Sequence, residues 1–263
     1  MPAPTSQTNV SCALQSLHFL YHELRTEDSK YSYVLGMDEF ERQIDFFAQR
    51  QAEGRPGSRP EITFDDGHIS NYQLALPILQ TRGLKARFFI TVGWTGHKPG
   101  YMGWQELRSL REAGQAIGAH GWSHTLLTHC NNDALKTELG RARLTLEDKL
   151  GSAITTMSLP GGRYNNRVIA ACLESGYKQI YTSEPKAEPI PAGILVGRIN
   201  VLQGMKMDWI ASLLEPSSVT LGKMGREYRV KVLAKNLLGD RVYEKVWALV
   251  NRKEVDSAEA AGE

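Results

Sequence analysis

Short apolar runs rich in β-branched and aromatic residues alternate along this chain with longer segments of helical period. This alternation predicts a parallel sheet whose strands are joined by crossover helices. The expected strands are 17–21, 61–64, 86–92, 116–119, 154–159, 179–181 and 193–199. The expected helices lie near 38–52, 71–82, 104–114, 132–150, 165–175 and 207–214. Elements in this number and order favour an α/β fold, a distorted or incomplete (β/α)7 barrel in which working residues collect at the carboxyl ends of the strands.

The chain is long enough for one such barrel with an added C-terminal helical segment. Its 263 residues, 41% of them hydrophobic, have the composition of a globular protein with a substantial core. The prediction is a barrel over residues 10–222, followed by basic amphipathic helices and an acidic tail over 223–263.

The C-terminal segment is strongly basic between residues 223 and 253 and carries apolar residues at helical spacing. Its basic residues are Lys223, Arg226, Arg229, Lys231, Lys235, Arg241, Lys245, Arg252 and Lys253, against the acids Glu227, Asp240 and Glu244. One interpretation is a surface that meets an anionic membrane or a lipid-phosphate substrate. The other is a helix pair that packs on the barrel and shows a charged face to water.

Overall charge and cysteine content limit the classes of partner and compartment. A formal net charge of +2 is too small to indicate nucleic acid as the main partner. Cys12, Cys130 and Cys172 are widely spaced without a C-x-x-C pair, so they are expected to be reduced and structural. No signal-peptide pattern and no stretch of about 20 apolar residues is visible. We therefore expect a cytoplasmic location, with peripheral contact to the inner membrane face through the basic segment.

Two adjacent acids, Asp65 and Asp66, stand in the sequence T-F-D-D-G at the end of the expected strand 61–64. Neighbouring carboxylates repel, and their burial is costly unless a cation or hydrogen bonds offset the charge. A divalent metal would resolve the conflict, with one acid as ligand and the other as base. A surface turn is the alternative explanation of this fragment taken alone.

Two histidines, His120 and His124, follow the expected strand 116–119. At this spacing, histidines on a helical turn share one face about 5–6 Å apart, which suits two imidazoles that bind one ion. Structural histidines are the alternative for an isolated pair. Because both motifs follow parallel strands, however, their side chains are expected at the same end of the barrel.

Together the two motifs offer one oxygen and two nitrogen ligands, with positions left for water and a substrate carbonyl. Three protein ligands with open positions are typical of a catalytic metal site rather than a structural one. Zn2+ is the first choice for such a donor set, and Co2+, Ni2+ or Fe2+ are alternatives.

The sequence T-F-D-D-G followed by G-A-H-G-W-S-H resembles the first two motifs of the polysaccharide deacetylases, the NodB-homology group of carbohydrate esterases. The resemblance runs from about residue 60 to about 200 and includes Pro160-Gly161-Gly162 in the third motif. It implies that Asp65 is the base, that Asp66, His120 and His124 bind the metal, and that the Gly161 N–H helps to bind the oxyanion.

The third motif departs from the family pattern. The family places an arginine ahead of this turn, whereas this chain has Ser158 there and Arg163 after Gly162. Arg163 could approach Asp65, contact sugar, or be a surface arginine near a turn. Arg198, at the end of the last expected strand, is a second candidate for the missing arginine.

The family's late Leu-x-His motif is also absent, since no histidine follows His129. Leu20-Tyr21-His22 ends the first expected strand instead, and some family members resemble a circular permutation with this motif at the start of the chain. The resemblance then implies that His22 is the general acid; a packing role for this histidine is the alternative.

The function implied is a metal-dependent N-deacetylase that hydrolyses the acetamide of an N-acetylated sugar in an oligosaccharide, polysaccharide or glycan precursor. An N-acetylated carbohydrate is the expected substrate. Two rival functions stay open: a catalytically inactive carbohydrate-binding barrel, and a metal-dependent hydrolase of small amides outside carbohydrate metabolism.

Overall fold

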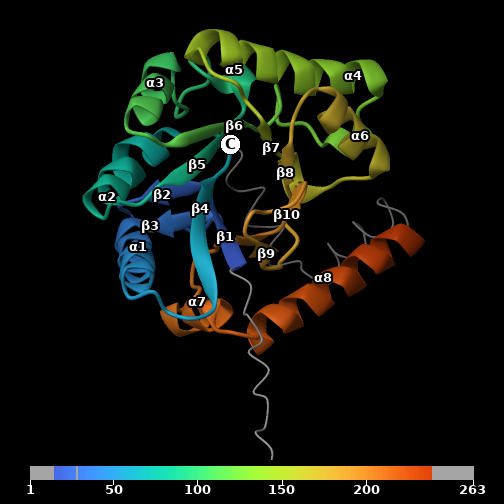
Figure 1. Cartoon of the computed structure of the whole chain (residues 1–263). Helices are drawn as coiled ribbons and strands as arrows, with labels where there is room; N and C mark the ends of the chain where they lie inside the picture. The colour runs from blue at the N-terminus through green and yellow to red at the C-terminus, as the bar shows by residue number, and fades with distance from the viewer. Residues whose placement is uncertain (1–14, 28, 239–263) are drawn as a thin grey trace, which may run out of the picture.

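A mainly parallel sheet curls into a nearly closed barrel at the centre of the molecule (Figure 1). The structure is a computed structural model and describes residues 15–27 and 29–238. Along the sheet the strands follow the order β10, β8, β7, β6, β5, β4, β1, β11. Their bounds are β1 Gln15–Tyr21, β4 Ser58–Phe64, β5 Ala86–Ile90, β6 Ala116–Ala119, β7 Thr156–Ser158, β8 Gln179–Tyr181, β10 Leu195–Val196 and β11 Arg198–Asn200. A short strand, β9 (Glu188–Pro189), pairs with β1 in the antiparallel sense. The expected barrel-like α/β fold is confirmed.

Closure of the barrel depends on the segment that the sequence suggested as one strand, 193–199. This prediction was wrong in detail, because the segment forms both β10, which pairs with β8, and β11, which pairs with β1. Gly197 separates the two strands, and its N–H donates to Glu188 Oε1 at 2.6 Å. A Cβ at this position would lie 2.4 Å from the carbonyl oxygen of Glu184, so only glycine fits where the two ends of the sheet meet.

Helices cover the outer side of the sheet, as the βα alternation predicts (Figure 1). They are α1 Met37–Ala52, α2 Leu76–Thr81, α3 Trp104–Glu112, α4 Asn132–Lys136, α5 Ala142–Leu150, α6 Asn166–Glu174, α7 Met207–Leu214 and α8 Val219–Leu238. Two expected helices contain π-helical turns, at Asn71–Ala75 before α2 and at Thr137–Arg141 between α4 and α5. A separate parallel pair, β2 (Glu23–Arg25) with β3 (Val34–Gly36), had no clear sequence signal.

The core lies on both faces of the sheet, which explains why the strands are continuous apolar runs rather than alternating ones. Every residue of β1 after Gln15 is buried. Across the sheet, Phe19 is level with Ile62, and Phe64 stacks on Phe88 with ring centroids 4.9 Å apart. This packing gives the carboxyl ends of β1, β4 and β5 a rigid base.

The described part of the C-terminal segment is one helix, α8, which begins beside α7 and passes the β8–β10 side of the barrel (Figure 1). The expected boundary between residues 222 and 223 falls inside this helix. Val219, Val230 and Leu233 are exposed on it. The remainder of the basic segment and the acidic tail, residues 239–263, lie outside the described residues. Of the described helices, none is both long and apolar enough to cross a membrane.

Candidate active site

The two acids of T-F-D-D-G occupy the turn that directly follows β4. Asp65 is level with the end of β1, and its N–H donates to the Tyr21 carbonyl at 3.0 Å. The backbone then enters the left-handed region at Asp66 (φ 72°) and Gly67 (φ 86°). This turn separates the two carboxylates: that of Asp65 is buried, whereas that of Asp66 is partly exposed, at 22%.

Asp65 is held by a bidentate ion pair with Arg198. The Arg198 Nη1 and Nη2 groups donate to Asp65 Oδ1 and Oδ2 at 2.7 and 2.8 Å. Ser158 Oγ also donates to Asp65 Oδ2 at 2.8 Å and accepts from Arg198 at 2.7 Å. Burial raises the pKa of Asp65, but the Arg198 guanidinium, with smaller contributions from His120 and His22, holds the pKa below its usual value. Asp65 is therefore a buried carboxylate that stays ionised.

Arg198 thus supplies the guanidinium that the third motif lacks, and Ser158 at the motif position binds both partners. Of the two arginines left open for this place, Arg198 is the one that pairs with Asp65. Arg163 lines a cavity on the side of α8, and its expected contact with substrate stays a prediction. The physical reason is topological: β11 closes the barrel beside β1, and its first residue, Arg198, reaches Asp65 from there.

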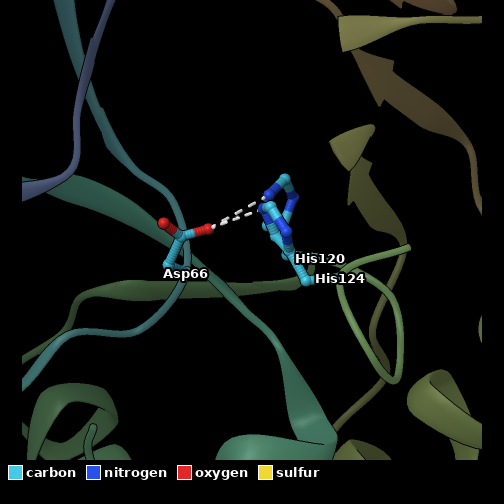
Figure 2. A group of neighbouring side chains, drawn as sticks. All are labelled: Asp66, His120 and His124. Carbon is cyan, nitrogen blue, oxygen red and sulfur yellow. Dashed lines mark ion pairs between the residues drawn. The ribbon is translucent and has the colours of Figure 1, made fainter. Parts of the chain in front are cut away.

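Asp66, His120 and His124 come together from two different loops (Figure 2). Asp66 Oδ1 lies 3.3 Å from His120 Nε2 and 3.2 Å from His124 Nε2. Two ligand atoms that each lie about 2.0–2.1 Å from a tetrahedral Zn2+ are roughly 3.3 Å apart, so these distances fit ligands of one ion. Asp66 Oδ1 is also buried without a well-formed hydrogen bond from any described group. The three residues therefore fit a divalent metal.

Electrostatics at this cluster also favour a cation. Burial alone would raise the pKa of Asp66, but the imidazoles of His120 and His124 hold it well below its usual value. Burial lowers the pKa of His120, and Asp65 and Asp66 outweigh burial and raise it. Both shifts reflect the attraction between the carboxylates and positive charge on the imidazoles, and a metal ion bound here would supply such charge without protonating either ring.

The expected helical turn between the two histidines was wrong. Residues 120–124 are not helical, and the chain instead passes through left-handed conformations at Gly121 (φ 79°) and His124 (φ 64°). The His120 ring is oriented by a 2.9 Å hydrogen bond between Nδ1 and the Ser158 carbonyl, which leaves Nε2 to face Asp66. The Trp94 ring stacks on that of His124, with centroids 5.2 Å apart.

Glu138 is a site residue that sequence reasoning missed. Its buried carboxylate accepts the N–H groups of Trp122 and Ser123 at 2.8 and 2.9 Å and the Ser123 hydroxyl at 2.6 Å. These three bonds fix the loop that joins His120 to His124. Glu138 lies in the middle of an expected helix, far along the chain from the motif, so no local signal marks it.

Replacing Glu138 with glutamine is expected to weaken zinc binding by about 10- to 100-fold, the usual cost of losing a group that orients a ligand. The amide is neutral, so the bonds that the loop donates to the ionised carboxylate lose their charge assistance and become weaker. Competition with a chromogenic chelator measures the affinity. The matched control is Glu112→Gln, which changes an exposed glutamate on α3. Unchanged zinc affinity in Glu138→Gln would show that the loop keeps its shape without this carboxylate.

His22 follows β1 directly and is level with Asp65 of the neighbouring strand, because Tyr21 pairs with Phe64. Its Nδ1 is buried and has no hydrogen-bond partner among the described residues. Burial lowers the pKa of His22, whereas the nearby Asp66 and Asp65 carboxylates act to raise it. The ring packs edge-on against Tyr33, with centroids 4.9 Å apart. The position suits a proton donor at the site, and that role stays a prediction.

Gly161 lies in the turn after β7 and adopts a left-handed conformation (φ 63°). A Cβ there would lie 2.8 Å from Leu126 Cδ2, so this turn packs closely against the His124 loop, and its positive φ favours glycine. Its expected contribution to oxyanion binding involves only the backbone N–H and also stays a prediction.

Fold and site together define an α/β barrel with a candidate catalytic metal centre at the carboxyl ends of its strands. Residues 54–180 match the family described as polysaccharide deacetylase. This part of the chain is therefore similar to the polysaccharide deacetylase family, as its motifs indicate.

Two curated relatives are similar to parts of the chain. YxkH of Bacillus subtilis (strain 168), whose name places it among the polysaccharide deacetylases, is 29% identical over 155 residues, which are 59% of this chain and 55% of YxkH. An uncharacterised 30.6 kDa protein of Geobacillus stearothermophilus is 27% identical over 124 residues, or 46% of this chain and 45% of that protein. The chain thus spans about half the length of the curated relatives it matches.

Solved structures share the fold. The Streptococcus pyogenes deacetylase PplD, in complex with acetate, superposes with a TM-score of 0.69 at 19% identity, covering 78% of this chain and 100% of that chain. A polysaccharide deacetylase from Bacillus cereus has a TM-score of 0.67 at 17% identity, covering 77% of this chain and 70% of that chain. These similarities support the NodB-like barrel.

Proposed function

We propose that this chain is a metal-dependent deacetylase that hydrolyses the acetamide of an N-acetylated sugar. One observation carries the proposal: an ionised, arginine-bound carboxylate lies beside a group of one carboxylate and two imidazoles spaced as ligands of a single ion. Asp65 and Asp66 supply the two carboxylates, and His120 and His124 the imidazoles. Similarity to the polysaccharide deacetylase family supports a carbohydrate as the substrate class.

Asp66, His120 and His124 are the proposed metal ligands, with Zn2+ as the proposed ion. When bound, such an ion would polarise the acetamide carbonyl and lower the pKa of a water molecule. The His120 ring is already oriented for this task by its bond to the Ser158 carbonyl. The Glu138 carboxylate keeps the loop that carries His124 in place.

Asp65 is the proposed general base. Because Arg198 keeps it ionised, it can accept a proton from the attacking water, and the bidentate pair fixes the direction of its oxygens. His22 would give a proton to the departing amine, since an unprotonated amine is a poor leaving group. The Gly161 N–H would donate to the oxyanion that forms when water adds to the carbonyl.

A combined metal and product analysis tests the proposal. The purified protein is expected to contain one equivalent of a divalent metal and to release acetate from short N-acetylglucosamine oligomers. Chelation should abolish the release, and added Zn2+ should restore it. Mass spectrometry should show a loss of about 42 daltons per reaction, the difference between an acetyl group and hydrogen.

The same measurement separates the rival functions. Metal and sugar binding without acetate release from any N-acetylated sugar would indicate a carbohydrate-binding barrel. Hydrolysis of small acetamides with no activity on sugars would indicate an amide hydrolase outside carbohydrate metabolism. Either outcome would contradict the proposed function.

A further inference from the structure

The cavity that Arg163 lines is at the same end of the barrel as the candidate metal centre. It has a volume of about 1030 Å3 and is lined by residues 161–167, 183–184, and 228–229 with 231–233, together with Thr128. The first two segments follow β7 and β8, which run parallel to β4 and β6, so they lie at the carboxyl ends of the strands. The third belongs to α8, which forms the opposite wall. The cavity begins at Gly161, the turn that approaches the His124 loop.

Cations dominate the described lining of this cavity. Arg167, Arg229 and Lys231 contribute positive charge, against one carboxylate, Glu184. Arg167 bonds only weakly to neutral acceptors, the Thr128 carbonyl at 3.4 Å and Asn132 Oδ1 at 3.3 Å. Arginine forks suit oxyanions such as carboxylate and phosphate because two parallel N–H groups match two oxygens.

The one carboxylate of the lining is itself paired. Glu184 Oε2 lies 3.5 Å from the Nζ of Lys186, which is outside the lining. Lys186 also lies 3.4 Å from Glu188 Oε1, so it offsets part of the negative charge that Glu184 brings to the cavity. The described surface retains a net positive charge.

Aromatic side chains give the cavity a second property. Tyr164 and Tyr228 face it from the loop after β7 and from α8, respectively. Burial raises the pKa of Tyr228 to about 12, so its hydroxyl is neutral at physiological pH and can both donate and accept hydrogen bonds. Flat aromatic rings with polar tips suit sugar rings, which have an apolar face and hydroxyl groups at the edge.

From this combination we propose that the cavity is a subsite for an acidic glycan, one that carries a carboxylate or phosphate near the acetylated sugar. The proposal rests on the proposed function and narrows its substrate class. Pockets for ligands typically have volumes of about 300–1,000 Å3, so the cavity has room for one or more sugar units beyond the unit that is deacetylated. Arg229 and Lys231 make α8 part of this subsite rather than a mere addition to the barrel.

Direct binding tests the subsite without requiring catalysis. Three probes are compared by calorimetric titration of the full chain: a hyaluronan tetrasaccharide, which carries carboxylates, N-acetylglucosamine 1-phosphate, and the neutral, fully N-acetylated form of chitotetraose, called chitotetraose below. At least one acidic probe should bind better than chitotetraose. The double variant Arg229→Gln/Lys231→Gln should bind that probe with about tenfold lower affinity, since two charge-assisted contacts are lost. The probe that responds identifies the acidic group.

A matched control removes the same charge from the same helix. Lys223 and Arg226 lie on α8 outside the lining, so Lys223→Gln/Arg226→Gln should leave binding of every probe unchanged. The subsite would be disproved by equal binding of acidic and neutral probes, by equal losses in both double variants, or by a loss for chitotetraose as large as that for the acidic probes. Circular dichroism of both variants confirms that α8 persists.

Failure of this proposal can be told apart from failure of the proposed function. Charge-dependent binding without acetate release from any substrate would support the acidic-glycan subsite and contradict the proposed deacetylase activity. Acetate release from chitotetraose, with no effect of probe charge on binding or KM, would support the deacetylase activity and contradict the acidic-glycan subsite.

Discussion

Replacing Asp65 with asparagine is expected to lower kcat for acetate release by roughly 10²- to 10⁴-fold, the usual contribution of a positioned general base. The amide has nearly the shape of the carboxylate and can still accept a bond from Arg198, but it cannot take a proton from water. Zinc content should stay near one equivalent, because Asp65 pairs with Arg198 and Ser158 rather than with the candidate metal ligands. Steady-state kinetics and metal analysis on the same preparation measure both quantities.

Asp66→Asn is the matched control at the adjacent position. Its Oδ1 faces both imidazoles, so this variant should lose zinc as well as activity. The division of roles between the two acids would be wrong if Asp65→Asn lost its metal while Asp66→Asn kept it. It would also be wrong if Asp65→Asn retained the parent kcat.

Arg198→Ala is expected to destabilise the protein by about 3–5 kcal/mol, because it leaves the buried Asp65 carboxylate without its ion-pair partner. It should also change the pH dependence of the reaction. In the parent chain Arg198 holds the pKa of Asp65 below its usual value against the effect of burial. Without the guanidinium, burial raises the pKa of Asp65, so the acidic limb of kcat/KM should move to higher pH. Urea unfolding and a pH–rate profile measure the two effects.

A second variant keeps this prediction testable even if Arg198→Ala unfolds. Ser158 Oγ lies 2.7 Å from Arg198 Nη2, so loss of the arginine side chain opens space next to Ser158. The double variant Ser158→Arg/Arg198→Ala returns the arginine to the position that the family motif gives it. It should regain much of the stability and move the acidic limb back toward lower pH. An acidic limb that stays at the parent pH in Arg198→Ala would show that Asp65 does not depend on this ion pair.

The exchange of Ser158 and Arg198 shows how a fold can conserve an interaction while its residues change. The buried base needs a cation on one side and a free face toward the water on the other. An arginine on β7 or on β11 can meet this need, because the side chains of both Ser158 and Arg198 reach Asp65 at the carboxyl end of β4. Chain order therefore matters less than position around the barrel.

Much of this protein could be predicted from sequence. The βα alternation gave the barrel class, and T-F-D-D-G and H-G-W-S-H gave the metal-ligand candidates, because each motif directly follows a strand. Because the strands of a parallel barrel all point in the same direction, both motifs lie at the same end of the barrel. These inferences need only local periodicity and the shared direction of parallel strands.

Tertiary structure decided the remainder. Arg198 and Asp65 are separated by 133 residues, and their contact exists only because the segment 195–200 splits at Gly197 to close the barrel. Glu138 binds the histidine loop from the π-helical turn between α4 and α5, and the two imidazoles converge through left-handed backbone rather than a helical turn. Local patterns identify groups that can do chemistry. Packing between distant segments decides which charged side chains lie beside those groups. It thereby sets the pKa values and the orientation of the groups.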